Sequence, residues 1–280
     1  MLHVLNTRPA ERANGLNQAL QQAGYQVSQL PLLELVAEPF EAIQPQLSEI
    51  WQVAVVVVVS PAAAQLGLAG LKQLAILPSQ LSCQWVAVGQ GTAAVLAQAG
   101  ITAQVPALET SEGMLALDIF QQAQHSTASC AITSDSAATG PIMFWRGHGG
   151  RQFMLKQLAS QQQVISLNLY DRQLPKSSKA QYQQLLNQPP PQVLVITSGM
   201  SWQHWLELGQ QFGTMTPPYI LVLGQRIYQK ICQQVVHMTV MTTPYIQTCN
   251  ATMPKVILLE NLNPVTILAV LNQLQKCQQT

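Results

Sequence analysis

The chain has 280 residues, enough for two domains of ordinary size, and 48% of them are hydrophobic, which is typical of a globular protein. Only 9% are charged and the formal net charge is +1, so no long-range field favours nucleic acid or an anionic membrane as a partner. The longest aliphatic run, Val53–Val59, is far shorter than the roughly 20 residues of a membrane span and no signal-peptide pattern opens the sequence, so we expect a cytoplasmic protein.

The first elements predict an alternation of strands and helices. Leu2–Asn6 is predicted to be a strand, Thr7–Pro9 a turn, Ala10–Ala23 a helix and Tyr25–Leu30 a second strand. The following segment, residues 34–39, is extended and ends at a proline, which disfavours a helix. We predict that it is a linker.

The middle of the chain continues the alternation. Val53–Val59 is a β-branched run without polar alternation, as expected of a central parallel strand buried on both faces. Ser60 is placed to cap the next helix, with Pro61 at its first position. His125–Thr139 is small, polar and aperiodic, and is predicted to be a loop. The other predicted elements here are strand Trp85–Val88, turn Gly89–Thr92, helix Ala93–Ala99, strand Ile101–Val105 and helix Ser111–Gln122.

A strand, a glycine turn, a helix and a strand follow between Gly140 and Arg172. The apolar run Ile142–Trp145 breaks at the turn Arg146–Arg151, and a second apolar run, Val164–Tyr170, follows the helical pattern. Residues 170–175 are predicted to form a second linker. The remaining predicted elements are helix Lys179–Asn187, strand Val193–Ile196, turn Thr197–Met200, helix Trp202–Gln211, strand Tyr219–Leu223, turn Gly224–Arg226, helix Ile227–Gln234, strand Val235–Met241 and helix Pro264–Leu274.

The two halves of the chain share turn residues at nearly one spacing. The aligned pairs are Arg8 with Arg146 and Ser60 with Ser198, each 138 positions apart, and Gly89 with Gly224, 135 positions apart. Three features in register indicate a duplication. We therefore predict an α/β protein with two similar, doubly wound parallel-sheet domains.

Several turns can present polar groups at the carboxyl ends of the predicted strands, where open parallel sheets bind ligands. Thr7, Ser60, Thr92 and Ser198 offer hydroxyls and helix-start N–H groups to carboxylates or phosphates. The alternative is that they only cap their helices. The turn Gly147–Gly150 lacks the spacing and the following acidic residue of a dinucleotide loop, so we do not expect a Rossmann cofactor site.

Tyr170 is a phenol in the second predicted linker. It could face a cleft and donate a proton, or it could be a buried packing residue. No carboxylate pair, serine-histidine set or metal-ligand spacing accompanies it in the sequence, and the five cysteines never form C-x-x-C. We expect reduced thiols, no metal and no cofactor.

An ordered set of motifs resembles the uroporphyrinogen-III synthase family over nearly the whole chain. The motifs are TRP (Thr7–Pro9), VVVVSPAAA (Val56–Ala64), VAVGQGTAAVLAQAGI (Val86–Ile101), SEGMLAL (Ser111–Leu117), RGHGGR (Arg146–Arg151), NLYDR (Asn168–Arg172) and VITSGMSW (Val195–Trp202).

The resemblance implies a chain that starts in one domain, builds a second and returns to finish the first. The first domain would comprise residues 1–33 and 176–280, the second residues 40–169, and the linkers residues 34–39 and 170–175. The repeat spacing alone would instead favour two simple tandem domains.

The resemblance also implies an activity. Members of the family are lyases of tetrapyrrole biosynthesis that cyclise hydroxymethylbilane without cofactor or metal, losing water and inverting the last pyrrole ring. Departure of the hydroxyl gives an azafulvene, and attack at the substituted carbon gives a spiro intermediate that fragments and recloses. The expected partner is this small molecule, with room for a transient contact with the preceding pathway enzyme, and we expect a monomer.

The residues that match the family pattern imply a site. Tyr170 matches the tyrosine that assists hydroxyl departure. The implied substrate-binding residues are Thr7, Arg8, Ser60, Gln90, Gly91, Thr92, Arg146, Gly147, Arg151, Ser198, Gly199, Met200 and Arg226. The family usually has threonines after Gly224, whereas this chain has Arg226 and Ile227, which removes a hydroxyl and adds a cation.

Two other functions are compatible with the sequence. A divergent, non-catalytic tetrapyrrole-binding or partner protein would keep the fold without depending on Tyr170. A bilobal enzyme acting on nucleotides or sugar phosphates would instead bind those ligands at the same turns.

Overall fold

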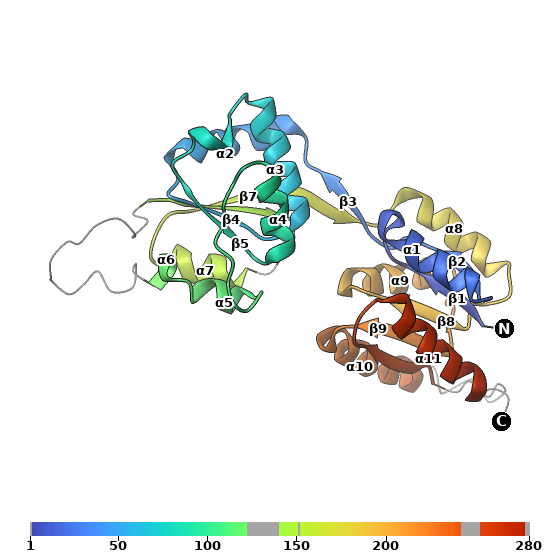
Figure 1. The fold of residues 1–280 in the computed structure, drawn as a ribbon. Coiled ribbons are helices and arrows are strands. Elements are labelled where there is room, and N and C mark those ends of the chain that lie inside the picture. The colour runs from blue at the N-terminus through green and yellow to red at the C-terminus, as the bar shows by residue number, and fades with distance from the viewer. Residues whose placement is uncertain (1, 122–139, 151, 242–252, 278–280) are drawn as a thin grey trace. The chain divides into compact units, whose positions relative to one another are not determined.

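The computed structural model describes residues 2–121, 140–150, 152–241 and 253–277 (Figure 1). The chain forms two compact units, one from Met1–Glu34 with Gln173–Thr280 and the other from Leu35–Arg172. Because both ends of the chain belong to the first unit, the chain crosses between the units twice. None of the helices within the described residues is long and apolar enough to span a membrane. The loop predicted at His125–Thr139 lies outside these residues.

The first unit contains a sheet with strand order β10-β9-β8-β1-β2, whose neighbouring strands all pair in parallel. Adjacent residues of β1 point to opposite faces. Val4 packs with α1 and α11, and Leu5 packs with α8, α9 and α10. The elements are β1 (His3–Asn6), α1 (Ala10–Gln22), β2 (Gln26–Gln29), α8 (Lys176–Leu186), β8 (Val193–Ile196), α9 (Gly199–Phe212), β9 (Tyr219–Leu223), α10 (Gln225–Met241), β10 (Lys255–Leu259) and α11 (Pro264–Cys277).

The second unit contains a sheet with strand order β3-β7-β6-β4-β5. Its central strands β4, β5, β6 and β7 pair in parallel. The elements are β3 (Glu34–Ala37), α2 (Phe40–Ser48), the short 3-10 helix η1 (Glu49–Gln52), β4 (Val55–Val58), α3 (Pro61–Gln73), the 3-10 helix η2 (Pro78–Gln80), β5 (Gln84–Ala87), α4 (Gln90–Gln98), α5 (Ser111–Leu115), α6 (Asp118–Gln121), β6 (Ile142–Gly147), α7 (Phe153–Ala159) and β7 (Val164–Gln173).

Strand β4 shows why its valine run has no polar alternation. Val56 and Val58 pack in a core with α2, α3 and α4, whereas Val55 and Val57 pack with α5, α6 and α7 on the other face. All four side chains are buried. Helices therefore cover both faces of the sheet, and the prediction of two parallel-sheet α/β domains is confirmed.

The two segments predicted as linkers, residues 34–39 and 170–175, are largely in strands, and the boundaries between the two units fall within them. Residues 34–37 form β3, and the second segment continues β7 as far as Gln173; β3 and β7 are neighbours in the sheet. The pairing extends beyond β3, since the backbone N–H of Glu38 donates to the oxygen of Leu169 at 3.0 Å. The backbone N–H and C=O groups of an extended segment need hydrogen-bond partners, and these two segments supply such partners to each other.

Other predicted elements also differ. Val235–Met241 is not a strand but the end of α10, because Ile227, Ile231 and Val235 recur at helical spacing and pack against the core of the first unit. Residues 101–105 contribute only a single bridge, from Gln104 to Val86. Strand β10 was not predicted, although its apolar run Val256–Leu259 is of the same kind as the run that predicted β4.

We predict that Gly67→Ala destabilises the second unit. Gly67 lies in α3, and a Cβ atom there would stand 2.2 Å from Cε3 of Trp145, which is fully buried in β6. Overpacking of this kind costs about 1–3 kcal/mol. The free energy of unfolding in urea measures it, and Gly91→Ala in α4 is the control, because its Cβ would meet only Pro61 at 3.9 Å. Equal effects of the two substitutions would contradict the prediction.

Candidate functional site

A β-bulge sets the position of Tyr170. Strands β6 and β7 pair in register as far as Arg146 with Asn168, and the register then shifts so that Gly147 pairs with Tyr170. Burial along β7 alternates up to this point, but Leu169 and Tyr170 are both about 1% exposed. A Cβ atom on Gly147 would lie 2.3 Å from Cε2 of Tyr170. The bulge therefore brings the ring against a backbone that has room only for glycine.

The hydroxyl of Tyr170 has two partners. It lies 3.1 Å from Oγ of Ser60, and Nη2 of Arg172 donates to it at 3.0 Å. The Arg172 guanidinium also lies over the phenol ring, with Cζ 5.1 Å from the centroid, in a cation–π contact. Because a guanidinium only donates, the phenol oxygen accepts from Arg172 and its own proton remains for Ser60 or for a ligand.

Ser60 is held by its place at the start of α3. Its Oγ accepts a hydrogen bond from the backbone N–H of Ala63 at 3.1 Å, and Pro61 occupies the first turn. The predicted capping role of Ser60 is therefore present, and the same oxygen also reaches Tyr170. The helix cap and the contact to the phenol are not alternatives at this residue.

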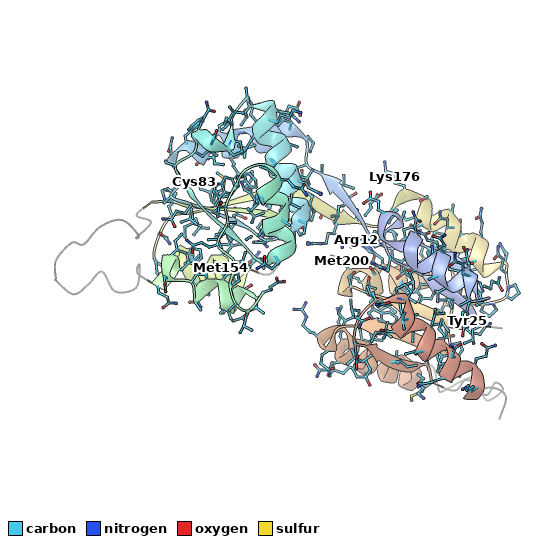
Figure 2. The ribbon with its side chains drawn as sticks, in the orientation of Figure 1. Arg12, Tyr25, Cys83, Met154, Lys176 and Met200 are labelled. Carbon is cyan, nitrogen blue, oxygen red and sulfur yellow. The ribbon has the colours of Figure 1, made fainter. Side chains whose placement is uncertain are left out.

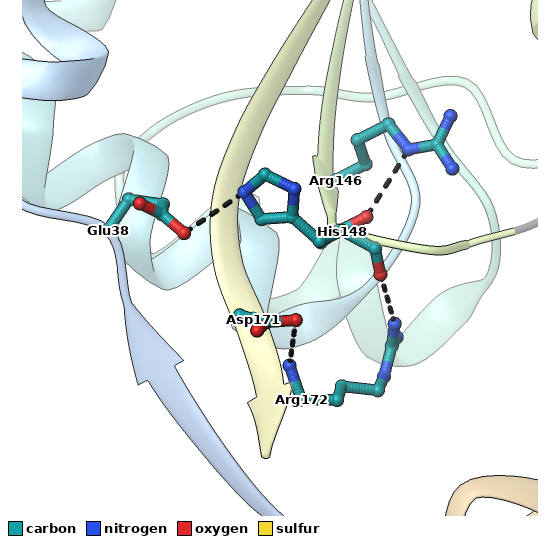
Figure 3. A network of polar contacts seen from close by, with 6 residues as sticks. Glu38, Arg146, His148, Asp171 and Arg172 are labelled. Atoms are coloured by element: carbon teal, nitrogen blue, oxygen red, sulfur yellow. Dashed lines mark hydrogen bonds and ion pairs between the residues drawn. The ribbon is translucent and has the colours of Figure 1, made fainter.

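The turn after β6 is fixed by arginine side chains (Figure 3). Arg146 is only 5% exposed, and its Nη2 donates to the oxygen of Gly150 at 2.6 Å. Nη1 of Arg172 donates to the oxygen of His148 at 3.3 Å. His148 in turn donates its backbone N–H to the backbone oxygen of Tyr170 at 2.8 Å, and its Nε2 lies 3.0 Å from a carboxylate oxygen of Glu38.

A cavity of about 200 Å³ opens at the carboxyl ends of β4, β5 and β6. Burial lowers the pKa of Arg146, and the positive charge of Arg172 lowers it further, against a smaller opposite effect of Tyr170. The lining that the structure describes contains two arginine residues and no aspartate or glutamate. The lining residues are Val59, Val88, Ser111, Met114, Phe144, Arg146, Gly147, Gly150, Met154, Leu155 and Arg172.

The turn before α4 is occupied by a side chain of the same unit. The backbone N–H of Gln90 donates to Oε1 of Glu109 at 2.8 Å, and the Glu109 carboxylate lies so close to Gly89 that a Cβ there would stand 2.4 Å from it. Thr92 is only 2% exposed, whereas Gly91 is exposed. The carboxylate of Glu109 thus already accepts a hydrogen bond from a backbone N–H group at the start of α4, in accordance with the preference of helix N-termini for anions.

In the first unit, the hydroxyls of two predicted site residues make hydrogen bonds within the protein. Oγ1 of Thr7 is buried and donates to the oxygen of Val195 at 2.5 Å, which ties the end of β1 to β8. Oγ of Ser198 accepts from the backbone N–H of Ser201 at 3.0 Å and lies 2.7 Å from its Oγ. Ser198 therefore caps α9, in the way that Ser60 caps α3 in the second unit.

The other predicted residues of the first unit are more accessible. Burial, and then the charge of Arg12, lowers the pKa of Arg8, which is partly exposed. Met200, at the start of α9, is 36% exposed (Figure 2), and a Cβ on Gly199 beside it would meet nothing within 4 Å. Arg226 is exposed at the start of α10. Arg151 lies outside the described residues.

Comparison with known proteins gives the family of the chain. A family model described as uroporphyrinogen-III synthase HemD matches residues 14–237, well over half of the sequence. The chain belongs to the uroporphyrinogen-III synthase family. The resemblance inferred from the ordered motifs is thereby confirmed.

Solved structures of uroporphyrinogen-III synthases share the fold. A mutant enzyme from the extremely thermophilic bacterium Thermus thermophilus superposes with a TM-score of 0.64 at 14% identity, covering 99% of this chain and 100% of that one. The enzyme from Helicobacter pylori gives 0.54 at 12% identity, covering 98% and 100%. At this identity the comparison shows the fold alone, so the site of this family member must be judged from its own residues.

Sequence reasoning placed Tyr170, Ser60, Arg146 and Gly147 in the site of this uroporphyrinogen-III synthase family member, and these four lie together in the second unit. It assigned no role to Arg172. A signal was present, because residues two apart on a strand share a face, so Arg172 follows Tyr170 on the same side of β7. Glu109 had no such signal, since its contact spans 19 residues.

The contact of Tyr170 with Gly147 can be tested by a double-mutant cycle. Gly147→Ala should destabilise the protein by about 1–3 kcal/mol, because the added Cβ collides with the ring. In a Tyr170→Ala background the ring is gone, so the same substitution should add little. Urea unfolding of the four proteins gives the coupling. An equal cost in both backgrounds would show that Gly147 is required for another reason.

Proposed function

We propose that the chain is a uroporphyrinogen-III synthase, which converts hydroxymethylbilane into uroporphyrinogen III with loss of water and inversion of the last ring. The observation that carries the proposal is the hydroxyl of Tyr170, which is held by Ser60 and Arg172 in a chain of this family. A phenol in this setting is fixed in direction, and fixed donors are effective in catalysis because no reorganisation is needed at reaction.

In the proposed reaction, the hydroxyl of the substrate leaves with a proton and the remaining chain becomes an azafulvene. Attack of the last pyrrole at its substituted carbon forms a spiro intermediate, which fragments and recloses with that ring inverted. Tyr170 donates the hydrogen bond or proton that the leaving hydroxyl requires. Arg172 keeps the phenol oxygen occupied as an acceptor, so that the phenol proton is available for donation.

The substrate carries many carboxylates, and we assign their recognition to groups at the carboxyl ends of strands in each unit. In the first unit these are Arg8, Ser198, Gly199, Met200 and Arg226, together with the turn at Thr7, whose own hydroxyl donates to the oxygen of Val195. In the second unit they are Ser60, Gln90, Gly91, Thr92, Arg146, Gly147 and Arg151. Backbone N–H groups at helix starts bind anions without adding net charge, which suits a chain whose formal charge is only +1. At Gln90 a substrate carboxylate would have to replace that of Glu109.

The test is the product formed from hydroxymethylbilane. The protein should form the type III isomer, whereas spontaneous closure gives type I. Tyr170→Phe should slow type III formation by about 10²- to 10⁴-fold, as loss of a general acid does. The matched control is Tyr182→Phe in the first unit. Tyr182 is also fully buried, and its hydroxyl donates a hydrogen bond to the oxygen of Gly213 at 2.8 Å. Loss of this hydroxyl should lower stability and leave the rate of type III formation unchanged.

Three outcomes would correct this proposal at different levels. Formation of type I alone, at the uncatalysed rate, would overturn the enzymatic function and favour a non-catalytic tetrapyrrole-binding protein. Normal type III formation by Tyr170→Phe would overturn only the role of that residue. Slowing by Tyr182→Phe to the same degree would show that general destabilisation, and not proton donation, explains the effect.

A further inference from the structure

A larger cavity lies within the first unit, between helices α8 and α9. Its volume is about 540 Å³, within the roughly 300–1,000 Å³ of pockets that hold small organic ligands. Helix α8 contributes Lys176 and Lys179 to the lining. Helix α9 contributes His204, Glu207 and Leu208. Because residues three and four apart lie on one face of a helix, each helix lines the cavity with a single face.

Two neighbouring carbonyl groups fix the helices that form the walls. The hydroxyl of Ser178, a fully buried residue of α8, donates to the oxygen of Pro31 at 2.5 Å. On α9, Nδ1 of His204 lies 2.7 Å from the oxygen of Leu32, the next residue of the chain. Both helices are therefore anchored to the same short segment after β2. A cavity with fixed walls costs less free energy to occupy than one that must be ordered by its ligand.

His204 turns one ring nitrogen toward this cavity. A carbonyl oxygen only accepts, so Nδ1 carries a proton and Nε2 is left for another partner. The residue is only 9% exposed, and Nε2 makes no hydrogen bond within the described part of the chain. Among the described residues, the side-chain atom that is sealed from solvent without a partner is instead Oε1 of Gln181. Nε2 is therefore accessible, and His204 lines the cavity into which it opens.

The charged residues of the lining are Lys176, Lys179 and Glu207. Both lysines are exposed, and neither forms a salt bridge with a described residue. The carboxylate of Glu207 accepts a hydrogen bond from Nε2 of Gln203, one turn earlier on α9, at 3.0 Å. Two lysines against one glutamate leave an excess of positive charge, which increases when Nε2 of His204 is protonated. The cavity is therefore suited to an anion.

We propose that this cavity binds a phosphate monoester of a small hydroxylated molecule. A phosphate monoester has three terminal oxygens, one for each of the two ammonium groups and one for the Nε2–H of protonated His204. A carboxylate has only two oxygens and would leave one of these donors without its own acceptor. The site adds a ligand to the proposed function and does not depend on that function.

The remaining lining residues fit the organic part of such a ligand. Leu174, Pro175 and Leu208 supply apolar surface against which carbon atoms can pack. The carboxylate of Glu207 would repel the phosphate, but it accepts hydrogen bonds from hydroxyl groups. A ligand with hydroxyls next to its phosphate therefore uses every charged group of the lining, whereas a bare anion does not.

The site can be tested without turnover, with glycerol 3-phosphate as the ligand. In protein labelled with ¹⁵N at histidine, the Nε2 signal of His204 is followed during titration, at ionic strength held constant with chloride. Parallel titrations use glycerol, which lacks the phosphate, and succinate, which has the charge but only carboxylates. We expect a saturable shift with glycerol 3-phosphate, no shift with glycerol, and binding of succinate that is at least tenfold weaker.

Variants with opposite changes of charge should have opposite effects on this binding. Lys176→Gln and Lys179→Gln should each weaken it by roughly tenfold, as for a lost charge-assisted hydrogen bond. Glu207→Gln should tighten it, because the substitution removes a negative charge and keeps an acceptor for a hydroxyl. The matched control is Lys230→Gln, an exposed lysine of α10 outside the lining, which should leave the affinity unchanged. Circular dichroism checks that each variant is folded.

The outcomes separate this inference from the proposed function. Absence of a saturable shift with glycerol 3-phosphate, or an unchanged affinity in both lysine variants, would overturn the site. Equal affinity for succinate would overturn the preference for phosphate. Tyr170→Phe should bind glycerol 3-phosphate as the unchanged protein does, so loss of binding in that variant would contradict the independence of the two sites. Binding by a protein that forms no type III product would support the site while the proposed function failed.

Discussion

The contact between the ring of Tyr170 and the backbone of Gly147 is the constraint on which the arrangement of the second unit's site depends. The ring can lie there only because the register of β6 and β7 shifts at this point and because residue 147 has no side chain. From that position the hydroxyl meets Ser60, and the guanidinium of Arg172 lies over the ring. The cap of α3, the glycine turn at the end of β6 and the last residues of β7 therefore all contact the side chain of Tyr170.

The second general feature is that, under the proposed function, a chain of nearly neutral charge binds an anionic substrate through local groups. Helix starts supply N–H groups, and the carboxylate of Glu109 at Gln90 shows that one such start binds an anion within the fold. Arg8 and Arg146, to which the proposed function assigns substrate carboxylates, are partly and almost completely buried, respectively. Under this proposal, recognition depends on geometry at each turn and not on attraction at long range.

Much of the fold could be predicted because its central strands, β1, β4, β6 and β8, are buried on both faces. The run Val55–Val58 has no polar alternation, and this identified a central parallel strand. The prediction from sequence failed where tertiary packing determined the structure. The β-branched residues around Val235 favoured a strand, but they form the end of helix α10. In the candidate site, Ser60 and Tyr170 were singled out from turn position and motif, and their hydroxyls are in contact in the structure. The bulge that joins them was not, because a register shift depends on two strands and leaves no mark in either alone.

The double crossing of the chain also affects the order in which the protein can fold during synthesis. Strand β1 emerges first, yet it pairs with β8, so that Val4 must wait for Val193 before the sheet of the first unit can close. The second unit, by contrast, is continuous from Leu35 to Arg172. It can bury its core on the ribosome while β1, α1 and β2, which have one another as partners, still lack β8 and the other elements of the first unit, since domains generally fold as units. The part of the sequence that is made first therefore belongs to the unit that is completed last.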